Sequence, residues 1–228
     1  MSRYALAGTI CLLAGSAWAQ SPSGATAPSP TAADAAKPVL AMEEPLPGDF
    51  WTYEVRDEIS GNVTATRTNV VTEVSPSEIS VRYSIAGKET DGLNVYDRSW
   101  NLKSSVPWKY RPHDGSGITS PLKASASWSF ASENINGDNG NIWRQTGRSK
   151  VVGQEAITTK AGTFDTFKIE TVVFRSPTKD PTRKVEITQQ TWYAPAIDHW
   201  VKRTLVTRAD KHLVVNNTVE LVDYGRKK

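Results

Sequence analysis

Cysteine is nearly absent from this 228-residue sequence, because Cys11 is its only occurrence. A single thiol cannot form an internal disulfide, and Cys11 lies in a segment that we expect to be removed on export. We therefore expect a mature chain without disulfides, thiolate catalysis or cysteine metal ligands. The sequence also has little excess of one charge, because the net charge is only +3 and basic residues are mostly interleaved with acidic ones. This balance argues against a nucleic-acid groove and against a membrane-steering patch.

Residues 1–19 have the pattern of a signal peptide. A basic residue precedes a largely apolar run from Tyr4 to Ala14, and Ala17-Trp18-Ala19 fits a small-x-small cleavage site. The apolar run is too short to span a bilayer as a helix. Ile10, which precedes the cysteine, does not fit the small-residue box of bacterial lipoproteins. We predict a periplasmic protein, or a secreted one, with no transmembrane anchor after cleavage.

Residues 20–44 are rich in Pro, Ala and Ser and show no periodicity. Such a composition buries too little apolar surface to offset the entropy of ordering, so we predict a disordered linker. It could serve as a tether, or it could simply separate the cleavage site from the fold. Residues 45–228 are then expected to form a single β domain of ordinary size.

Alternation with a period of two dominates the chain after residue 45. In the clearest segment Ile79, Val81 and Tyr83 alternate with Ser80 and Arg82, which is typical of an antiparallel strand with one wet face. About ten such segments follow each other at hairpin spacing, and no mature segment has a convincing helical pattern. A long sheet without helices must curl to cover its apolar face. We predict an all-β fold of about ten antiparallel strands in a curled sheet, open barrel or half-barrel.

The most regular stretch runs from Ala161 to Leu205 and predicts three consecutive strands. The segment 103–125 is the least regular, because it is polar and interrupted by prolines. Loops of this length inside a compact domain are uncommon and often functional. The sequence does not indicate what this one does.

Four segments together resemble a known family: PGDFWTYEV, PLKASASWSF, VVGQEAITTKAGTFDTFKIE and TWYAPAIDHWVKRTL. They resemble the uncharacterised bacterial envelope proteins grouped as TapB-like, a domain of unknown function, over nearly all of residues 45–224. The AGTFDTFKIE and WYAP blocks are the most specific part. More distantly the chain is similar to curved β-sheet carriers of the lipoprotein-carrier type, although it lacks an obvious plug helix. The resemblance implies an envelope β protein, and it implies no assigned activity.

No pattern for catalysis or metal binding emerges from the remaining residues. His113, His199 and His212 lack the spacing of a metal motif, and residues 134–141 miss the glycine position and the bidentate glutamate of a calcium loop. Ser116 lies outside any complete nucleophile-elbow motif. We therefore predict a protein that is not an enzyme and that carries no cofactor and no metal.

Tryptophan is the most informative residue type in the mature chain. Indole rings either fill a core or line an apolar cleft, and most of them are expected to fill the core. Trp100, Trp108 and Trp143 lie nearest to predicted loops. These three are our candidate ligand-binding residues.

Two hypotheses about function follow. In the first, the curled sheet binds a lipid, a lipoprotein acyl chain or another apolar or amphiphilic ligand against its inner face. In the second, a filled barrel engages an envelope protein or a glycan through its loops or a free sheet edge. A cavity of several hundred cubic ångströms favours the first hypothesis, and a filled interior favours the second. We favour the first, with no nucleic acid as partner.

Overall fold

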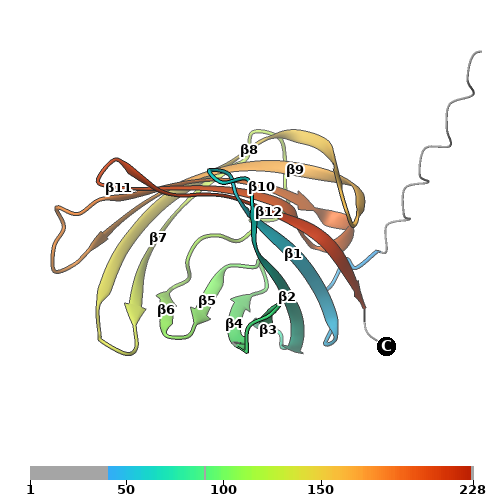
Figure 1. The fold of residues 1–228 in the computed structure, drawn as a ribbon, viewed down its shortest axis with the longest axis horizontal. Helices are drawn as coiled ribbons and strands as arrows, with labels where there is room; N and C mark the ends of the chain where they lie inside the picture. The colour runs from blue at the N-terminus through green and yellow to red at the C-terminus, as the bar shows by residue number, and fades with distance from the viewer. Residues whose placement is uncertain (1–40, 90, 227–228) are drawn as a thin grey trace, which may run out of the picture. The chain divides into compact units, whose positions relative to one another are not determined.

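A computed structural model describes residues 41–89 and 91–226, and it shows a closed barrel of twelve antiparallel strands (Figure 1). Each strand pairs with its neighbours in sequence, and β1 also pairs with β12. The predicted signal peptide and residues 20–40 of the predicted linker lie outside the described residues. The strands are β1 Asp49–Asp57, β2 Val63–Val74, β3 Glu78–Ile85, β4 Asp91–Asp97, β5 Leu102–Ser105, β6 Trp108–Arg111, β7 Ser127–Asn136, β8 Ile142–Thr159, β9 Gly162–Pro177, β10 Val185–Ala194, β11 His199–Ala209 and β12 His212–Arg226.

The barrel is closed by the pairing of the first strand with the last. Residues of β1 pair along their length with β12, for example Tyr53 with Leu221 and Val55 with Val219. The all-β class and the antiparallel order are thus confirmed, whereas the prediction of about ten strands in an open sheet or half-barrel is wrong. Alternation within single strands cannot reveal a pairing between the two ends of the chain.

The sequence did not reveal β5 and β6, which have four residues each. They lie within the segment that we expected to be a long polar loop. Four residues with prolines at both ends of β6, Pro107 and Pro112, show too little alternation to be recognised. Only Glu133 to Asn136 of β7 pair with β6, so the first residues of β7 pair on one side alone, with β8.

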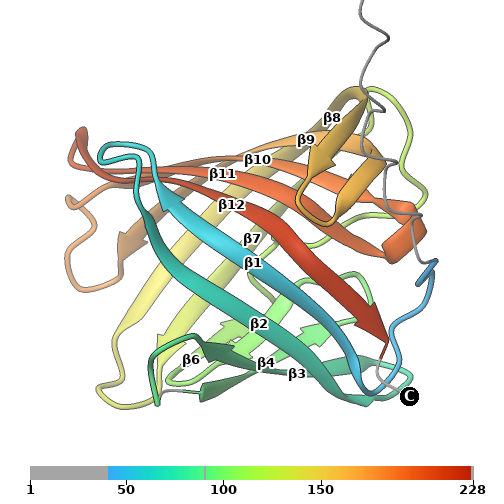
Figure 2. The ribbon, with the colours of Figure 1, turned by 45° about the vertical axis from the view of Figure 1, so that its right-hand side comes forward.

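The three-strand stretch predicted between Ala161 and Leu205 is confirmed as β9, β10 and β11 (Figure 2). In β9, Phe167, Ile169 and Val173 pair with Tyr193, Thr191 and Ile187 of β10. The described chain contains one helical turn, the 3-10 turn η1 Pro195–Ile197 between β10 and β11. No helix that could span a bilayer occurs in the described part of the chain.

One end of the barrel is filled by aromatic side chains, and we call it the closed end. Trp51 is 1% exposed and lies 4.3 Å from His199 and 5.7 Å from Trp100, measured between ring centroids. Met42, which we had placed in the linker, is also buried here, and its backbone N–H donates to Ala196. The full cluster comprises Met42, Trp51, Tyr53, Val71, Ile79, Val81, Trp100, Ala161, Phe164, Trp192, Ala194, Ile197, Trp200, Val201, Leu221 and Tyr224.

The connection 112–126, which we call the inserted loop, folds against the inside of the wall. Ile118 is 5% exposed and belongs to a second apolar cluster with Val151 and Ile169. Gly115 has a positive φ of 76°, and a Cβ at this position would lie 2.1 Å from the Phe130 ring. The close approach of Gly115 to Phe130 therefore requires glycine.

Candidate functional site: the barrel lumen

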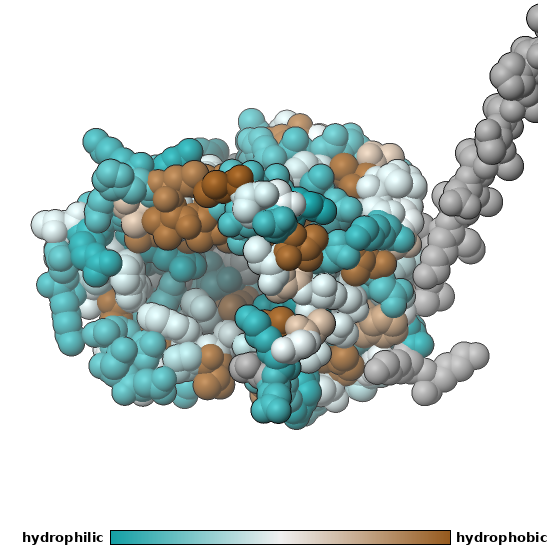
Figure 3. All heavy atoms as spheres, viewed as in Figure 1, coloured by the Kyte–Doolittle hydropathy of each residue, from teal (hydrophilic) through white to brown (hydrophobic). Residues whose placement is uncertain are grey.

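The half of the barrel beyond the closed end is hollow. It contains three adjoining compartments of about 350, 350 and 330 Å³, which we call inner, middle and outer. The inner and middle compartments share Gln189 and Leu205 in their walls, and the middle and outer share Arg175 and Val185. The surface in Figure 3 is hollowed beneath an apolar region. The three compartments therefore form one lumen.

The width of a twelve-strand barrel explains why a lumen exists. An eight-strand barrel is just wide enough for its side chains to fill, and the diameter grows with strand number. In this protein bulky rings fill the closed end, whereas small side chains such as Ser105, Thr171 and Thr207 face the lumen. Such side chains cannot meet across the wider space. The floor of the inner compartment is formed by Tyr53 and Trp200, whose hydroxyl and backbone carbonyl are joined by a 2.9 Å hydrogen bond.

The lining changes in character along the lumen. The middle compartment has an aliphatic wall from Val173, Ile187 and Leu205, with Phe130 beside it. The outer compartment is lined by two indole rings, Trp108 and Trp143, together with Tyr110, Asn134, Arg175 and Val185. The inner compartment contains two of the lumen's arginines, and its polar lining residues include Arg67, Asn69, Asn94, Ser105, Asp114, Ser116, Gln189 and Arg203.

Three arginines carry the positive charge of the lumen: Arg67, Arg175 and Arg203. Arg175 Nε donates to Gln145 Oε1 at 2.6 Å, and Arg67 Nε donates to Asn69 Oδ1 at 2.9 Å. Both partners are neutral amides. Burial lowers the pKa of Arg175 and of Arg203 because it disfavours the charged guanidinium. Among the ion pairs of the described residues none involves these three arginines.

Asp114 is the only carboxylate lining the lumen in the described part of the chain. Its Oδ1 accepts the backbone N–H groups of Leu102 and Ser116 and the Ser116 hydroxyl. Burial raises its pKa, although these hydrogen bonds and the charge of Arg203 act in the opposite direction. Asp114 thus stabilises the inserted loop and leaves the lumen with an excess of cationic groups.

The structure brings together two of the three predicted binding residues. Trp108 and Trp143 both line the outer compartment, although they lie 35 positions apart in the sequence. Trp100 lies in the closed end, where it is 2% exposed and its Nε1 donates to Asp198 Oδ2 at 3.0 Å. We had placed Trp100 near a loop, and the sequence did not reveal that its side chain is buried there. Trp100 therefore supports the floor of the barrel and lines none of the three compartments.

Sequence reasoning missed the arginines, because charged residues on the strands were assigned to the solvated face. Their phase carried a signal. Arg203 lies two positions from Val201 and two from Leu205, and Arg175 lies two positions after Val173. Since residues two apart share a face of a strand, each arginine falls on the apolar face. An arginine on the buried face is uncommon and indicates a binding role or a buried partner.

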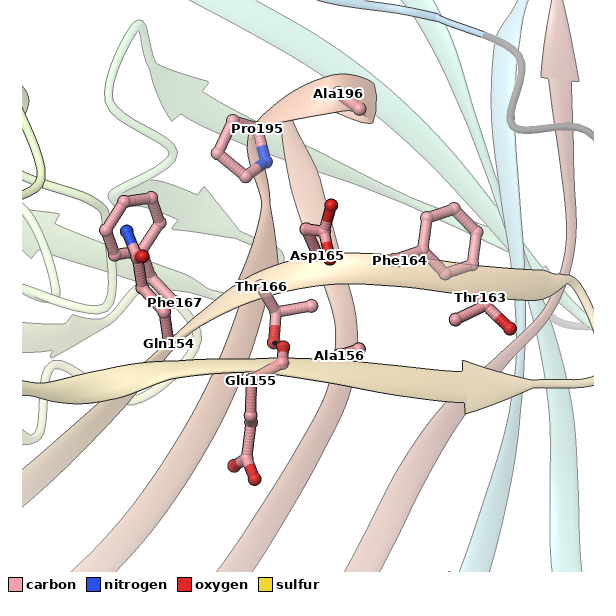
Figure 4. A pocket seen from close by; sticks show the side chains of 10 residues that line it. All are labelled: Gln154, Glu155, Ala156, Thr163, Phe164, Asp165, Thr166, Phe167, Pro195 and Ala196. Atoms are coloured by element: carbon pink, nitrogen blue, oxygen red, sulfur yellow. Dashed lines mark hydrogen bonds between the residues drawn. The ribbon is translucent and has the colours of Figure 1, made fainter.

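A separate groove lies on the outside of the barrel, between the β8–β9 hairpin and η1 (Figure 4). Its volume is about 590 Å³, and Phe164, Phe167 and Pro195 contribute apolar surface. Figure 4 shows the Glu155 side chain pointing away from η1. The carboxylate accepts Trp192 Nε1 at 2.6 Å. Glu155 therefore directs no free charge into the groove. The groove and the lumen have no lining residue in common.

The comparisons with known proteins concern family and fold. The DUF3108-like family model matches residues 124–203. The barrel is similar to a candidate lipoprotein from Parabacteroides distasonis and to a candidate exported protein with a YmcC-like fold from Bacteroides fragilis. For each the TM-score is 0.53 and the identity 15%, covering 82% of this chain and 100% of the other. The comparison with curated proteins gives no match.

A group of three or more side chains suited to hold a metal ion is not found among the described residues. The resemblance expected from the sequence is confirmed at the level of an uncharacterised β-protein family. Its specific blocks AGTFDTFKIE and WYAP both fall within the matched residues. The chain thus resembles the DUF3108-like proteins over residues 124–203 and shares its barrel fold with the two bacterial proteins above.

Proposed function

We propose that this protein is a non-catalytic binding protein of the bacterial envelope that holds an amphiphilic ligand in its lumen. The observation that carries this proposal is the row of three adjoining compartments of about 330 to 350 Å³ each inside the barrel. Ligand sites in proteins usually have volumes of about 300 to 1,000 Å³. The lumen reaches this range without any rearrangement.

The lining favours an amphiphile over a purely apolar molecule. Val173, Ile187 and Leu205 offer a surface for a hydrocarbon chain, and burying such a chain is worth about 0.8 kcal/mol per CH₂ group. The same lumen contains guanidinium and amide groups that an entirely apolar ligand would leave without partners. Leaving a polar group buried without a partner costs about 1 to 3 kcal/mol.

The proposal of a non-catalytic role rests on how the polar groups of the lumen are engaged. Ser116 donates its hydroxyl directly to Asp114, and the His113 Nδ1 accepts the Gly115 backbone N–H. No histidine therefore stands between serine and carboxylate as a general base would. Oδ1 of Asp114 already accepts the backbone N–H groups of Leu102 and Ser116.

The envelope location is supported by the expected signal peptide and by the descriptions of the two similar structures. One of these proteins is described as a candidate lipoprotein and the other as a candidate exported protein. The closed barrel also leaves no free edge at β1 or β12 for strand addition.

Native mass spectrometry of the chain exported to a bacterial periplasm, followed by solvent extraction, tests this proposal. We expect a co-purified amphiphile at close to one per chain, and reduced occupancy for Trp143→Ala at the outer compartment. Phe174→Ala is the matched control, because Phe174 lies on β9 and is 56% exposed on the outside. A bare mass, with no change in tryptophan fluorescence on adding alkyl amphiphiles, would reject the proposal and favour a protein or glycan partner.

A further inference from the structure

We infer that the lumen binds the anionic head group of its amphiphile at Arg203 and Arg67, with the hydrocarbon chain directed toward the outer compartment. This inference rests on the proposed function and adds the charge and the orientation of the ligand. The recognised chemistry is that of an oxyacid, either a carboxylate or a phosphate.

Arg203 lacks a partner adequate to its charge. Its Nε is buried and has no hydrogen-bond partner, and its Nη2 makes a single 3.4 Å contact to the Ser116 carbonyl. The guanidinium lies over the Trp200 ring, 3.5 Å from the centroid. Stacking fixes the plane of the guanidinium, and its Nη groups make only the long contact to Ser116 among the described residues. Arg203 therefore presents an oriented cation without an ion-pair partner to the inner compartment.

Arg67 lines the same compartment from β2, which β12 and β1 separate from β11 in the wall. It is held by two neutral contacts, the hydrogen bond to Asn69 and the Tyr83 ring, whose centroid lies 3.9 Å from the guanidinium carbon. Neither contact supplies negative charge. Asn94 in the same wall has a buried Oδ1 without a partner.

Energetics favour an anionic occupant over an empty site. A buried charge without a counter-charge costs several kcal/mol, and natural proteins retain such groups where they pair with something. Asp114 is the carboxylate of the lumen that could neutralise Arg203. It already accepts hydrogen bonds from Leu102 and Ser116, and it forms no ion pair with Arg203. An oxyacid oxygen pair would accept from the guanidinium and supply the missing charge.

The order of the compartments sets the orientation. The inner compartment contains two guanidinium groups and ends on Tyr53 and Trp200, so a head group placed there is enclosed. Next comes the aliphatic wall of the middle compartment and then the indoles Trp108 and Trp143. A chain attached to the head group would thus run along Val173, Ile187 and Leu205 toward the outer compartment, past the third guanidinium, that of Arg175.

The test measures binding of four dodecyl probes that differ in head group: dodecanoate, dodecyl phosphate, methyl dodecanoate and dodecyltrimethylammonium. Affinities are followed below micelle-forming concentrations by tryptophan fluorescence, with the full exported chain. We expect the two anions to bind about ten to a hundred times more tightly than the ester, and the cation to bind least. A preference between the two anions identifies the oxyacid.

Variants assign this preference to residues. Arg203→Leu should reduce anion affinity at least about tenfold and leave the ester unchanged, while the melting temperature of the empty protein stays level or rises because a buried charge is removed. Arg67→Met provides a second variant if Arg203→Leu fails to fold. Arg208→Leu is the control, since Arg208 lies on the same strand and is exposed.

The outcomes separate the two proposals. If no probe binds, the proposed function fails. If all probes bind alike and Arg203→Leu and Arg67→Met change nothing, the lumen binds hydrocarbon and the head-group inference is wrong. Loss of ester binding along with anion binding in Arg203→Leu would also overturn the inference, because it would mean that Arg203 only shapes the cavity.

Discussion

The closed end and the hollow half of this barrel are built from the same strands, yet one is packed and the other is not. On β1, Trp51 and Tyr53 are at most 2% exposed in the closed end, whereas Val55 two residues on lines the inner compartment. On β11, Trp200 belongs to the packed cluster, and Arg203 and Leu205 face the hollow. The pairing register of both strands shifts near this boundary, between Thr52 and Tyr53 of β1 and between Trp200 and Lys202 of β11. Side-chain volume changes at the same place, from packed rings to smaller or charged side chains.

This comparison separates stability from binding along one axis of the molecule. Bulky rings in mutual contact exclude water and contribute most of the burial energy. Residues around the hollow keep surface in reserve for a ligand. We expect substitutions in the closed end to change the free energy of unfolding and substitutions in the lumen to change affinity.

The largest expected effect tests this division directly. Trp51→Ala should lower the free energy of unfolding by about 3 to 5 kcal/mol, because it removes a fully buried indole from contact with Trp100 and His199. Leu205→Ala, which enlarges an existing hollow, should cost about 1 kcal/mol or less. Urea unfolding followed by circular dichroism measures both. Equal losses would show that the lumen is as tightly packed as the closed end.

A smaller effect is expected where the barrel closes at its packed end. Asp49 is fully buried and its carboxylate accepts Arg226 Nε at 2.7 Å and Nη2 at 3.0 Å, which joins β1 to the end of β12. Arg226→Ala should cost about 1 to 3 kcal/mol, since Asp49 would retain only the Leu46 N–H. The control Lys160→Ala breaks an exposed ion pair with Glu54 and should cost less than about 1 kcal/mol. Urea midpoints that shift alike would contradict a special role for the closure.

The smallest effect is a pH dependence confined to the closed end. Burial holds the pKa of His199 well below its usual value, and the nearby charge of Arg203 adds to this shift. The unfolded chain therefore binds a proton more readily, so stability is complete above about pH 6.5 and is lost as pH falls below it, by up to about 1.4 kcal/mol at pH 5.5. His199→Phe should remove this part of the acid limb in thermal melts. His212→Gln, at an exposed position, should leave it in place; if both variants behave alike, His199 is not its source.

Local alternation was enough to predict several elements of the fold. The regular stretch from Ala161 to Leu205 predicted three consecutive strands, and these are β9, β10 and β11. Such patterns depend only on the two-residue repeat of a strand, which a single sequence displays in full. The sequence also suggested Trp108 and Trp143 as ligand contacts. Both residues line the outer compartment, and their contact with a ligand remains a prediction.

The sequence by itself determined an all-β chain of antiparallel hairpins and the scarcity of cysteine that leaves its stability to packing. Only the tertiary structure decided that β1 meets β12, that Trp100 is core, and that Arg67 and Arg203 line the same compartment. The physical reason is that closure and hollowness depend on residues more than a hundred positions apart. Alternation reports which face a residue occupies, and only the closed wall determines whether that face meets another side chain or an open space.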